Sequence, residues 1–369
     1  MSEFNRLRAE ELMGRLSGDD FDALLLFPGP NIGYYTGFNI GLSERLAAAL
    51  LPMEGKPLFV INELEGELRG MKPWFTDKVT WREQDDPVKL LADTIRKEGL
   101  SHAKIGVPEE APWGWINKLH AALPDAKLTD ASDHLSYFRM IKTPQELEWI
   151  KEACGVADEA LETGFKQLHT DLTEYELSDI LTVEMRRLGG GQTFTGVLFG
   201  ERAALPHGEP GDSRLAPGEA VLVDMGCTVH GYWSDITRTV FYGEPSEEHT
   251  GIYETVLNAN IVAFNAVETG VTCESVDRAA RKVIEDAGYG KYFIHRLGHG
   301  VGLQIHEPPY IVRNNRQKLE PGMVFSDEPG IYIVGDIGVR IEDTVTCTKS
   351  GSERLTKFKR DLVTYPVKN

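Results

Sequence analysis

Five side chains in the C-terminal half of the chain could bind metal ions, and four of them are carboxylates. The set consists of Asp224, Asp235, His299, Glu328 and Glu342. Hard and borderline divalent cations bind such oxygen and imidazole ligands. Two cations about 3.5–4 Å apart generate hydroxide at neutral pH and stabilise both ends of a hydrolytic transition state. These residue types therefore predict a two-metal hydrolase.

Asp224 and Asp235 lie in a segment that is typical of a β-hairpin. Two β-rich runs flank His230-Gly231, a dipeptide that suits a two-residue turn. In the resulting register Asp224 faces Thr237, so Asp235 becomes its diagonal neighbour on the same face of the hairpin. Both carboxylates could then reach one cation. Considered alone, the hairpin is equally consistent with two solvated acids.

The other candidates lie in separate segments. His299 is flanked by glycines, which let the backbone approach a site closely, and His306 follows it in the same region. Neutral imidazole is a common metal ligand and proton shuttle. Glu328 and Glu342 follow apolar, strand-like residues, and a buried carboxylate needs a partner to offset its desolvation. An ion pair with Arg340 is the alternative for Glu342, but together the segments favour metal coordination.

Residues 1–138 alternate strand-like and helical segments, which predicts an α/β domain. The expected strands are 22–27, 57–61 and 104–108, and the expected helices are 4–16, 89–98 and 113–123. A chain of 369 residues exceeds the usual size of one hydrophobic core. We therefore expect a second domain over residues 139–369.

The second domain should begin with helices and continue with strands. Thr143 and Pro144 start one helix, and Thr173 with Glu176 forms a capping box that starts the next. A similar helix begins at Thr272, which hints at an internal duplication. Strand-rich sequence covers 192–199, 220–242, 294–305 and 323–346. This order predicts an α+β domain with an antiparallel sheet.

The composition limits the partners and the compartment. A net charge of −18 argues against binding to nucleic acid, which needs clustered basic residues. The four cysteines have no CxxC spacing, which is typical of reduced thiols in a cytoplasmic protein. The N-terminus does not resemble a signal peptide, and no apolar run reaches the roughly 20 residues that span a bilayer. We therefore expect a cytoplasmic protein with no membrane partner.

The order of these motifs resembles that of the pita-bread metallopeptidases, in the branch that holds proline dipeptidase (prolidase) and aminopeptidase P. The resemblance covers nearly the whole chain and rests on Ser234-Asp-Ile-Thr-Arg-Thr, Gly298-His-Gly-Val-Gly, His306-Glu-Pro-Pro, Glu328-Pro-Gly-Ile-Tyr and Val339-Arg-Ile-Glu-Asp. It implies an α+β fold of two domains, with an α/β creatinase-like N-terminal domain. The second would be a pita-bread catalytic domain with a curved antiparallel sheet.

The resemblance also implies how the ligands divide between two metal sites. Asp235 and Glu342 would bridge the two ions. Asp224 would complete one site, and His299 with Glu328 would complete the other. Manganese or cobalt is the expected metal, with zinc or iron as alternatives, because ligand type alone does not distinguish them.

Several substrate-side residues follow from the same resemblance. His207 and His306 match two histidines that act on the substrate. Arg340 matches an arginine that orients a bridging carboxylate, and Tyr232 matches an aromatic, substrate-binding position beside the metals. Arg296 could bind the free carboxylate of a dipeptide through a bidentate pair. A structural surface arginine is the alternative at that position.

The reaction implied by the resemblance is hydrolysis of Xaa-Pro bonds. A hydroxide that bridges the metals would attack the carbonyl carbon before proline, while His306 and a metal polarise the carbonyl oxygen. Glu328 would carry the proton to the departing nitrogen, and His207 would hold the substrate. The compact length favours a proline dipeptidase. Aminopeptidase P, methionine aminopeptidase, a hydrolase of another small amide and a non-catalytic binding module are the alternatives, and the intact ligand set argues against the last.

The resemblance further implies a homodimer that binds proline-containing di- or oligopeptides. The N-terminal domain of one subunit would then lie over the active site of the other. Residues 29–38, after the first predicted strand, are a candidate for this overhang, and a plain surface loop is the alternative.

Overall fold

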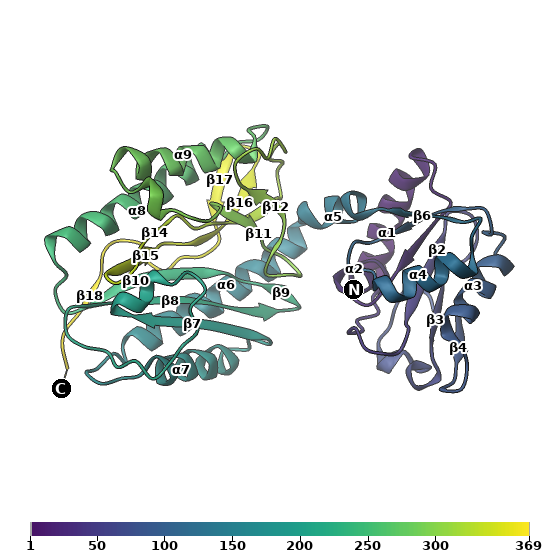
Figure 1. Ribbon diagram of the computed structural model, residues 1–369, viewed down its shortest axis with the longest axis horizontal. Coiled ribbons are helices and arrows are strands. Elements are labelled where there is room, and N and C mark those ends of the chain that lie inside the picture. Colours follow the sequence, from purple (N-terminus) through teal and green to yellow (C-terminus); the bar gives the residue numbers. More distant parts are fainter. Residues whose placement is uncertain (1, 369) are drawn as a thin grey trace. The chain divides into compact units, whose positions relative to one another are not determined.

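In the computed structural model the chain divides into two units, Met1–Arg139 and Met140–Asn369, and residues 2–368 are described (Figure 1). The first unit contains a six-stranded sheet in the order β4-β3-β2-β1-β5-β6. Its strands are β1 Ala23–Leu26, β2 Ala48–Pro52, β3 Leu58–Asn62, β4 Lys78–Trp81, β5 Lys104–Val107 and β6 Lys127–Asp130. The helices are α1 Ser2–Gly18, α2 Pro30–Thr36, α3 Pro87–Lys97, α4 Trp113–Ala122 and α5 Ser132–Met140. This arrangement confirms the predicted α/β class.

The strand β1 is buried over its whole length inside this sheet, where it pairs in parallel with β5 and antiparallel with β2. A strand buried on both faces reads as a continuous apolar run, which is why 22–27 was recognisable. The strands β2, β4 and β6 were not predicted. Helix α2 forms most of the segment 29–38, and its residues 31–36 are buried, so the surface-loop alternative is wrong.

The second unit contains two five-stranded sheets and a two-stranded pair. One sheet has the order β18-β10-β8-β7 with β9 beside β8, the other is β12-β11-β13-β16-β17, and β14 pairs with β15. The strands of the first sheet are β7 Thr193–Phe199, β8 Glu219–Val229, β9 Tyr232–Trp233, β10 Ile236–Tyr242 and β18 Thr364–Tyr365. The others are β11 Gly298–Gly300, β12 Glu307–Ile311, β13 Val324–Asp327, β14 Gly330–Ile333, β15 Ile337–Arg340, β16 Asp343–Thr348 and β17 Gly351–Arg354. Their pairing is antiparallel except between β10 and β18, which confirms the predicted sheet type.

Two pairs of helices cover these sheets. They are α6 Pro144–Phe165, α7 Glu174–Arg187, α8 Glu247–Ala266 and α9 Cys273–Asp286. In Figure 1 α8 and α9 lie above the strands and α7 lies below them, while α6 passes behind β8; α6 contacts both β8 and α7. Each half of the unit thus has a helix pair and a sheet, the arrangement that an internal duplication would give. No helix among residues 2–368 is long and apolar enough to cross a membrane.

Capping boxes begin both helices of the first pair: the box at Thr173 was predicted, whereas at Thr143 the sequence predicted only the N-cap. The Thr143 hydroxyl accepts a hydrogen bond from the Glu146 N–H, and the Glu146 carboxylate accepts one from the Thr143 N–H. Thr173 and Glu176 repeat this arrangement at α7. Each box satisfies amide groups that the first helical turn leaves without partners, which fixes where the helix begins.

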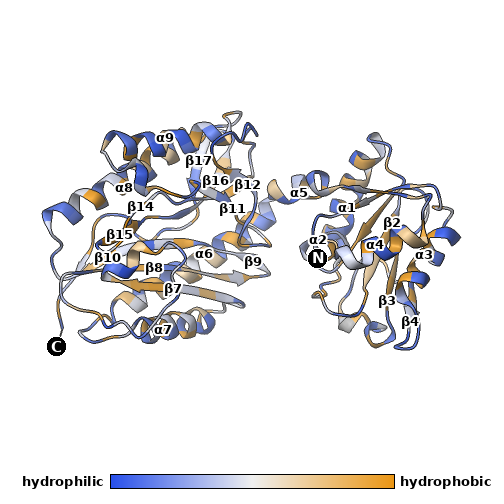
Figure 2. Cartoon of the chain, in the orientation of Figure 1, coloured by the Kyte–Doolittle hydropathy of each residue, from blue (hydrophilic) through white to orange (hydrophobic). Residues whose placement is uncertain are grey.

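An apolar core joins α6 and α7 to β8 and β10. It includes Leu161, Phe165, Leu181, Val223 and Val240. In Figure 2 the strand β8 is coloured largely hydrophobic, as expected for a strand between layers. Burial of each large apolar side chain contributes about 1.5–3 kcal/mol. This packing holds the hairpin that carries the first two predicted metal ligands.

Gly226→Ala should destabilise the protein by about 1–3 kcal/mol, the usual cost of overpacking. A Cβ at Gly226 would lie 2.0 Å from the Ser234 carbonyl oxygen, so the strand that leads to Asp235 would have to move. Gly155→Ala is the control, because Gly155 is exposed in α6 with nothing within 4 Å of an added Cβ. It should gain about 0.5–1 kcal/mol. Denaturant unfolding measures both, and an unchanged stability of Gly226→Ala would contradict this close packing.

Candidate metal centre

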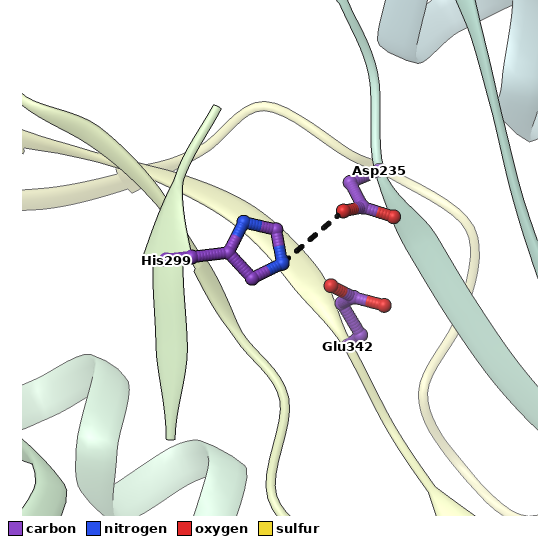
Figure 3. Close-up of side chains that lie close together, drawn as sticks. All are labelled: Asp235, His299 and Glu342. Carbon is purple, nitrogen blue, oxygen red and sulfur yellow. Dashed lines mark ion pairs between the residues drawn. The ribbon is translucent and has the colours of Figure 1, made fainter. Parts of the chain in front are cut away.

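Asp235, His299 and Glu342 come together in the second unit with one ligand atom of each within 4.8 Å of the others. Figure 3 shows the imidazole of His299 pointing toward both carboxylates, and its Nε2 lies 3.6 Å from Asp235 Oδ2. Asp235 directly precedes β10, His299 is on β11, and Glu342 lies between β15 and β16. All three are at most 4% exposed. Residues far apart in the sequence therefore form one buried group of possible ligands.

Glu328 extends this group on the side of His299. It follows β13, and its Oε1 lies 3.3 Å from His299 Nε2. Burial acts to raise the pKa of Glu328, but the hydrogen bond and charge of His299 outweigh it and lower the pKa to about 2. The carboxylate is therefore ionised over the whole neutral range.

Asp224 extends the group on the other side. The hairpin register is confirmed, because Asp224 faces Thr237 and the turn residues His230 and Gly231 have φ values of 53° and 86°. One oxygen of Asp224, Oδ2, accepts a hydrogen bond of 2.8 Å from Arg340 Nη2. The other, Oδ1, is buried and has no hydrogen-bond partner among the described residues. A buried carboxylate oxygen without a partner costs free energy unless a positive charge lies beside it. A cation bound next to this oxygen would offset that cost.

The carboxylates of the group repel one another. Burial, followed by the charges of neighbouring carboxylates, raises the pKa values of Asp235 and Glu342 well above their ordinary range. Burial also raises the pKa of Asp224, although the charge of Arg340 opposes this effect. Four carboxylates and one imidazole around one cavity form a donor set that fits hard or borderline divalent cations. The residue types in this group are therefore suitable metal ligands.

Three buried hydroxyl groups hold the ligands in place. The Ser326 hydroxyl accepts from the His299 N–H at 3.0 Å and donates to Glu328 Oε1 at 3.1 Å. The Thr237 hydroxyl donates to Glu342 Oε2 at 2.6 Å, and the Thr344 hydroxyl donates to the Asp235 carbonyl at 2.8 Å. Sequence reasoning missed all three. Each is two residues from a ligand in a strand-rich segment, so the period of two along a strand was the available signal.

Arg340 takes a different partner from the one considered in the sequence. Its guanidinium pairs with Asp224 rather than with Glu342. It also donates through Nε to the Thr237 hydroxyl at 3.0 Å, and that hydroxyl in turn bonds Glu342. Arg340 therefore reaches Glu342 through Thr237, a contact that would orient the carboxylate.

The five candidate ligands line a cavity of about 580 Å³ together with several residues that could contact a substrate. These are Phe194, Pro206, His207, Trp233, His295, Arg296, Ile305, His306 and Arg340. The rings of His299 and His306 meet edge to face, with centroids 4.0 Å apart. Burial, then the charges of His299 and Arg296, lower the pKa of His306 to about 4. His306 is thus a neutral imidazole beside the predicted ligands at neutral pH.

A buried acid anchors the loop that carries His207. The carboxylate of Glu174 is fully buried and accepts hydrogen bonds of 2.8 Å from the Phe199 and Gly211 amides. It also pairs with Arg202 at 3.0 Å. The short helical turn Gly200–Ala204 and His207 lie between these attachment points. His207 therefore faces the cavity from a loop whose ends are fixed.

Tyr232 is the predicted site residue that the structure does not bring to the cavity. It is 3% exposed, packs with Ile150 and Val301, and donates a hydrogen bond to Glu146 Oε1 at 2.9 Å. The next residue, Trp233, lines the cavity instead. Adjacent residues of a strand point to opposite faces, so Trp233 and not Tyr232 lines the cavity, contrary to the predicted position of Tyr232.

His295 is a cavity residue that sequence reasoning missed. Its Nε2 lies 2.9 Å from the Tyr332 hydroxyl, which accepts a hydrogen bond from Arg340 Nη1 at 3.1 Å. Burial lowers the pKa of His295. Its position four residues before His299 in the same polar, histidine-containing segment was the signal that could have identified it.

Comparisons with known proteins agree on one family. The family described as metallopeptidase family M24 matches residues 148–349, and the creatinase/prolidase N-terminal domain matches residues 8–141. An Xaa-Pro dipeptidase of Lactobacillus delbrueckii subsp. lactis is 36% identical over 367 residues, which cover 98% of this chain and 100% of that protein.

Two solved structures show the same fold. Dipeptidase PepE from Mycobacterium ulcerans superposes with a TM-score of 0.94 at 33% identity, covering 99% of each chain. An X-Pro aminopeptidase from Thermotoga maritima MSB8 superposes with a TM-score of 0.85 at 30% identity, covering 97% of this chain and 99% of that one.

Replacing two ligands by neutral isosteres, Asp235→Asn with Glu342→Gln, should stabilise the metal-free protein at pH 7, because burial and neighbouring carboxylates raise the pKa values of both acids. The raised pKa values mean that the folded state favours the protonated acids. The free energy of folding that comes from these protonated acids is fully present at low pH. It is lost as the pH rises through the pKa values of the folded state. The metal-free wild type should therefore lose stability toward neutral pH, and the variant should lose less.

Thermal unfolding against pH in the presence of a chelator measures this difference. Added Mn²⁺ should raise the unfolding temperature of the wild type and leave that of the variant unchanged. Parallel pH curves for the two proteins would refute the idea that carboxylate repulsion limits the metal-free state.

Proposed function

The chain belongs to metallopeptidase family M24, and on that basis we propose that it is a metal-dependent hydrolase of Xaa-Pro bonds that acts mainly on dipeptides. One observation carries the proposal. The five candidate ligands converge on one cavity, in a chain that matches an Xaa-Pro dipeptidase along that protein's whole length. The dipeptidases and prolidases among the solved relatives support the same activity.

The proposed ligands are the five residues predicted from the sequence. Asp235 and Glu342 would contribute to both of two divalent-ion sites, Asp224 would complete one of them, and His299 with Glu328 would complete the other. Divalent ions bound there supply Lewis acidity and lower the pKa of water. Manganese or cobalt is the proposed metal. Zinc and iron remain alternatives because they also accept this mixture of ligands.

The protein's own groups then act on the substrate. His306 is neutral, as its lowered pKa requires, and it donates a hydrogen bond to the carbonyl oxygen before proline. Glu328 is ionised, so it accepts a proton from the attacking water and delivers it to the departing proline nitrogen. His207 binds the peptide from the opposite loop. These roles require no other side chain to change its charge during the reaction.

The aromatic wall of the cavity supports the choice of proline. Phe194 and Trp233 both line it, and their rings lie 5.9 Å apart. A proline imide has no N–H, so it loses no hydrogen bond when it lies against apolar rings. An ordinary amide N–H would be left without a partner in the same position, which costs free energy. The wall therefore selects against peptides without proline.

Arg296 supports the choice of a dipeptide. It lines the cavity, and its guanidinium lies 4.6 Å from the centre of the Tyr310 ring, which restricts its position. A guanidinium pairs with a carboxylate through two parallel hydrogen bonds. It would recognise the free carboxylate that follows proline in a dipeptide. Cleavage of longer peptides, as by aminopeptidase P, is the second candidate, and the similarity to the X-Pro aminopeptidase favours it.

We also propose that the protein is a cytoplasmic homodimer. The four cysteines, Cys154, Cys227, Cys273 and Cys347, are buried and form no disulfide among the described residues, which fits a reducing compartment. Light scattering after size-exclusion chromatography measures the oligomeric state directly.

Proline release from Xaa-Pro dipeptides tests the central proposal. Protein stripped of metal should be inactive, and Mn²⁺ or Co²⁺ should restore cleavage, because the carboxylates alone supply no Lewis acid. Xaa-Pro-Xaa tripeptides and Xaa-Ala dipeptides are the comparison substrates. Efficient cleavage of tripeptides would move the assignment to an aminopeptidase. No cleavage of any Xaa-Pro peptide by the metal-loaded protein would reject the proposed function.

Arg296→Met should raise KM for dipeptides by about 10–100-fold, the value of a charge-assisted hydrogen bond. An Xaa-Pro amide, which lacks the carboxylate, should show no such change. Arg313→Met is the control, because Arg313 is exposed and pairs with Glu285 outside the cavity. Equal effects of Arg296→Met on the acid and the amide would assign Arg296 a structural role instead.

A further inference from the structure

A buried ion pair lies directly behind one of the cavity histidines. Lys142 Nζ and Glu307 Oε1 are 2.9 Å apart, and their side chains are 0% and 2% exposed. Charges at this depth are costly to desolvate, so such a pair adds little net stability compared with apolar side chains. The location of the pair, rather than its contribution to the stability of the fold, therefore indicates its role.

The pair is adjacent to the loop 301–306, which we call the His306 loop. His306 is exposed to the cavity, whereas Glu307, the next residue and the first of β12, is buried. Successive residues of extended chain point to opposite sides, so a fixed Glu307 side chain directs His306 toward the cavity. The second Glu307 oxygen, Oε2, also accepts a hydrogen bond from the Gln304 N–H at 3.3 Å. The Glu307 carboxylate thus contacts both Gln304 and Lys142, and these contacts fix the turn 304–307.

Lys142 is itself firmly held. Its N–H donates to the Gly322 carbonyl at 2.9 Å, and the preceding residue, Ile141, bridges to Met323 beside β13. A Cβ at Gly302 would lie 2.3 Å from Glu307 Oε1 and 3.1 Å from Lys142 Cε. The His306 loop therefore packs directly against the ion pair, and only a residue without a side chain fits there.

We propose that Lys142 and Glu307 are positioning residues for His306. They hold the His306 loop so that the imidazole stays against His299, at a ring separation of 4.0 Å, and faces the substrate. The inference rests on the proposed function, which gives His306 its role at the substrate carbonyl. Neither residue is among those that line the cavity. Their effect on the reaction passes through the loop alone.

The test uses the double variant Lys142→Met with Glu307→Leu, which leaves no unpaired buried charge and so should fold. We expect kcat to fall by about 10–100-fold with little change in KM, since His306 acts in the transition state. The affinity for Mn²⁺, measured by titration calorimetry, should stay at the wild-type value. In a His306→Ala background the double variant should cause no further loss. Additive losses, or weaker Mn²⁺ binding, would overturn the proposal.

Hydrogen exchange gives a readout that needs no substrate. Amides of residues 301–306 should exchange faster in the double variant, while those of α6 should not change. Glu307→Gln keeps an oxygen for the Gln304 N–H and should show a smaller effect, which preserves the test if the double variant does not fold. Lys166→Met, at an exposed pair with Glu162, is the control and should match wild type.

Failure of the proposed function and failure of this inference have different signatures. If wild-type protein cleaves no Xaa-Pro peptide, the function is wrong and the exchange experiment alone decides whether the pair holds the loop. If wild type is active but exchange in the His306 loop is unaltered by the variants, the positioning role is wrong and the function stands.

Discussion

Mutual repulsion among four carboxylates around one cavity is the constraint on which the second unit depends. Asp224, Asp235, Glu328 and Glu342 gather where burial already disfavours charge, and Arg340 is the cation paired with one of them. The fold tolerates this because a rigid framework and hydroxyl contacts fix the side chains, and divalent cations bound there would supply the missing positive charge. Stability and metal binding are therefore linked through the same carboxylates.

The cavity combines two kinds of support. The candidate ligands lie on or beside strands of two different sheets, so metal ions bound there would connect the β8–β10 hairpin to the β11–β13–β16 sheet. The two histidines proposed to act on substrate lie on loops, and each loop is tied to the interior by a buried acid. Glu174 serves the His207 loop, and Glu307 serves the His306 loop. Strands thus supply fixed ligands, and anchored loops supply the groups that meet a changing substrate.

The sequence predicted what local patterns encode and missed what only the tertiary structure creates. The hairpin register around Asp224 followed from the turn dipeptide, and the caps at Thr143 and Thr173 followed from short motifs. The orientation of Tyr232 could not be predicted in the same way. The motif resemblance identified an aromatic position, but it did not determine whether Tyr232 or Trp233 faces the cavity. The partnership of Lys142 with Glu307 spans 165 residues, and no pattern in one sequence joins positions so distant.

The wide spacing of the ligands has a consequence for biosynthesis. Asp224 is the first of the five to be synthesised, but the group is incomplete until Glu342 and the strand that follows it have been made and folded. Partly synthesised chains therefore have no assembled catalytic centre. In a peptidase built in this way, the group of candidate ligands is complete only after the last strands of the second sheet have folded.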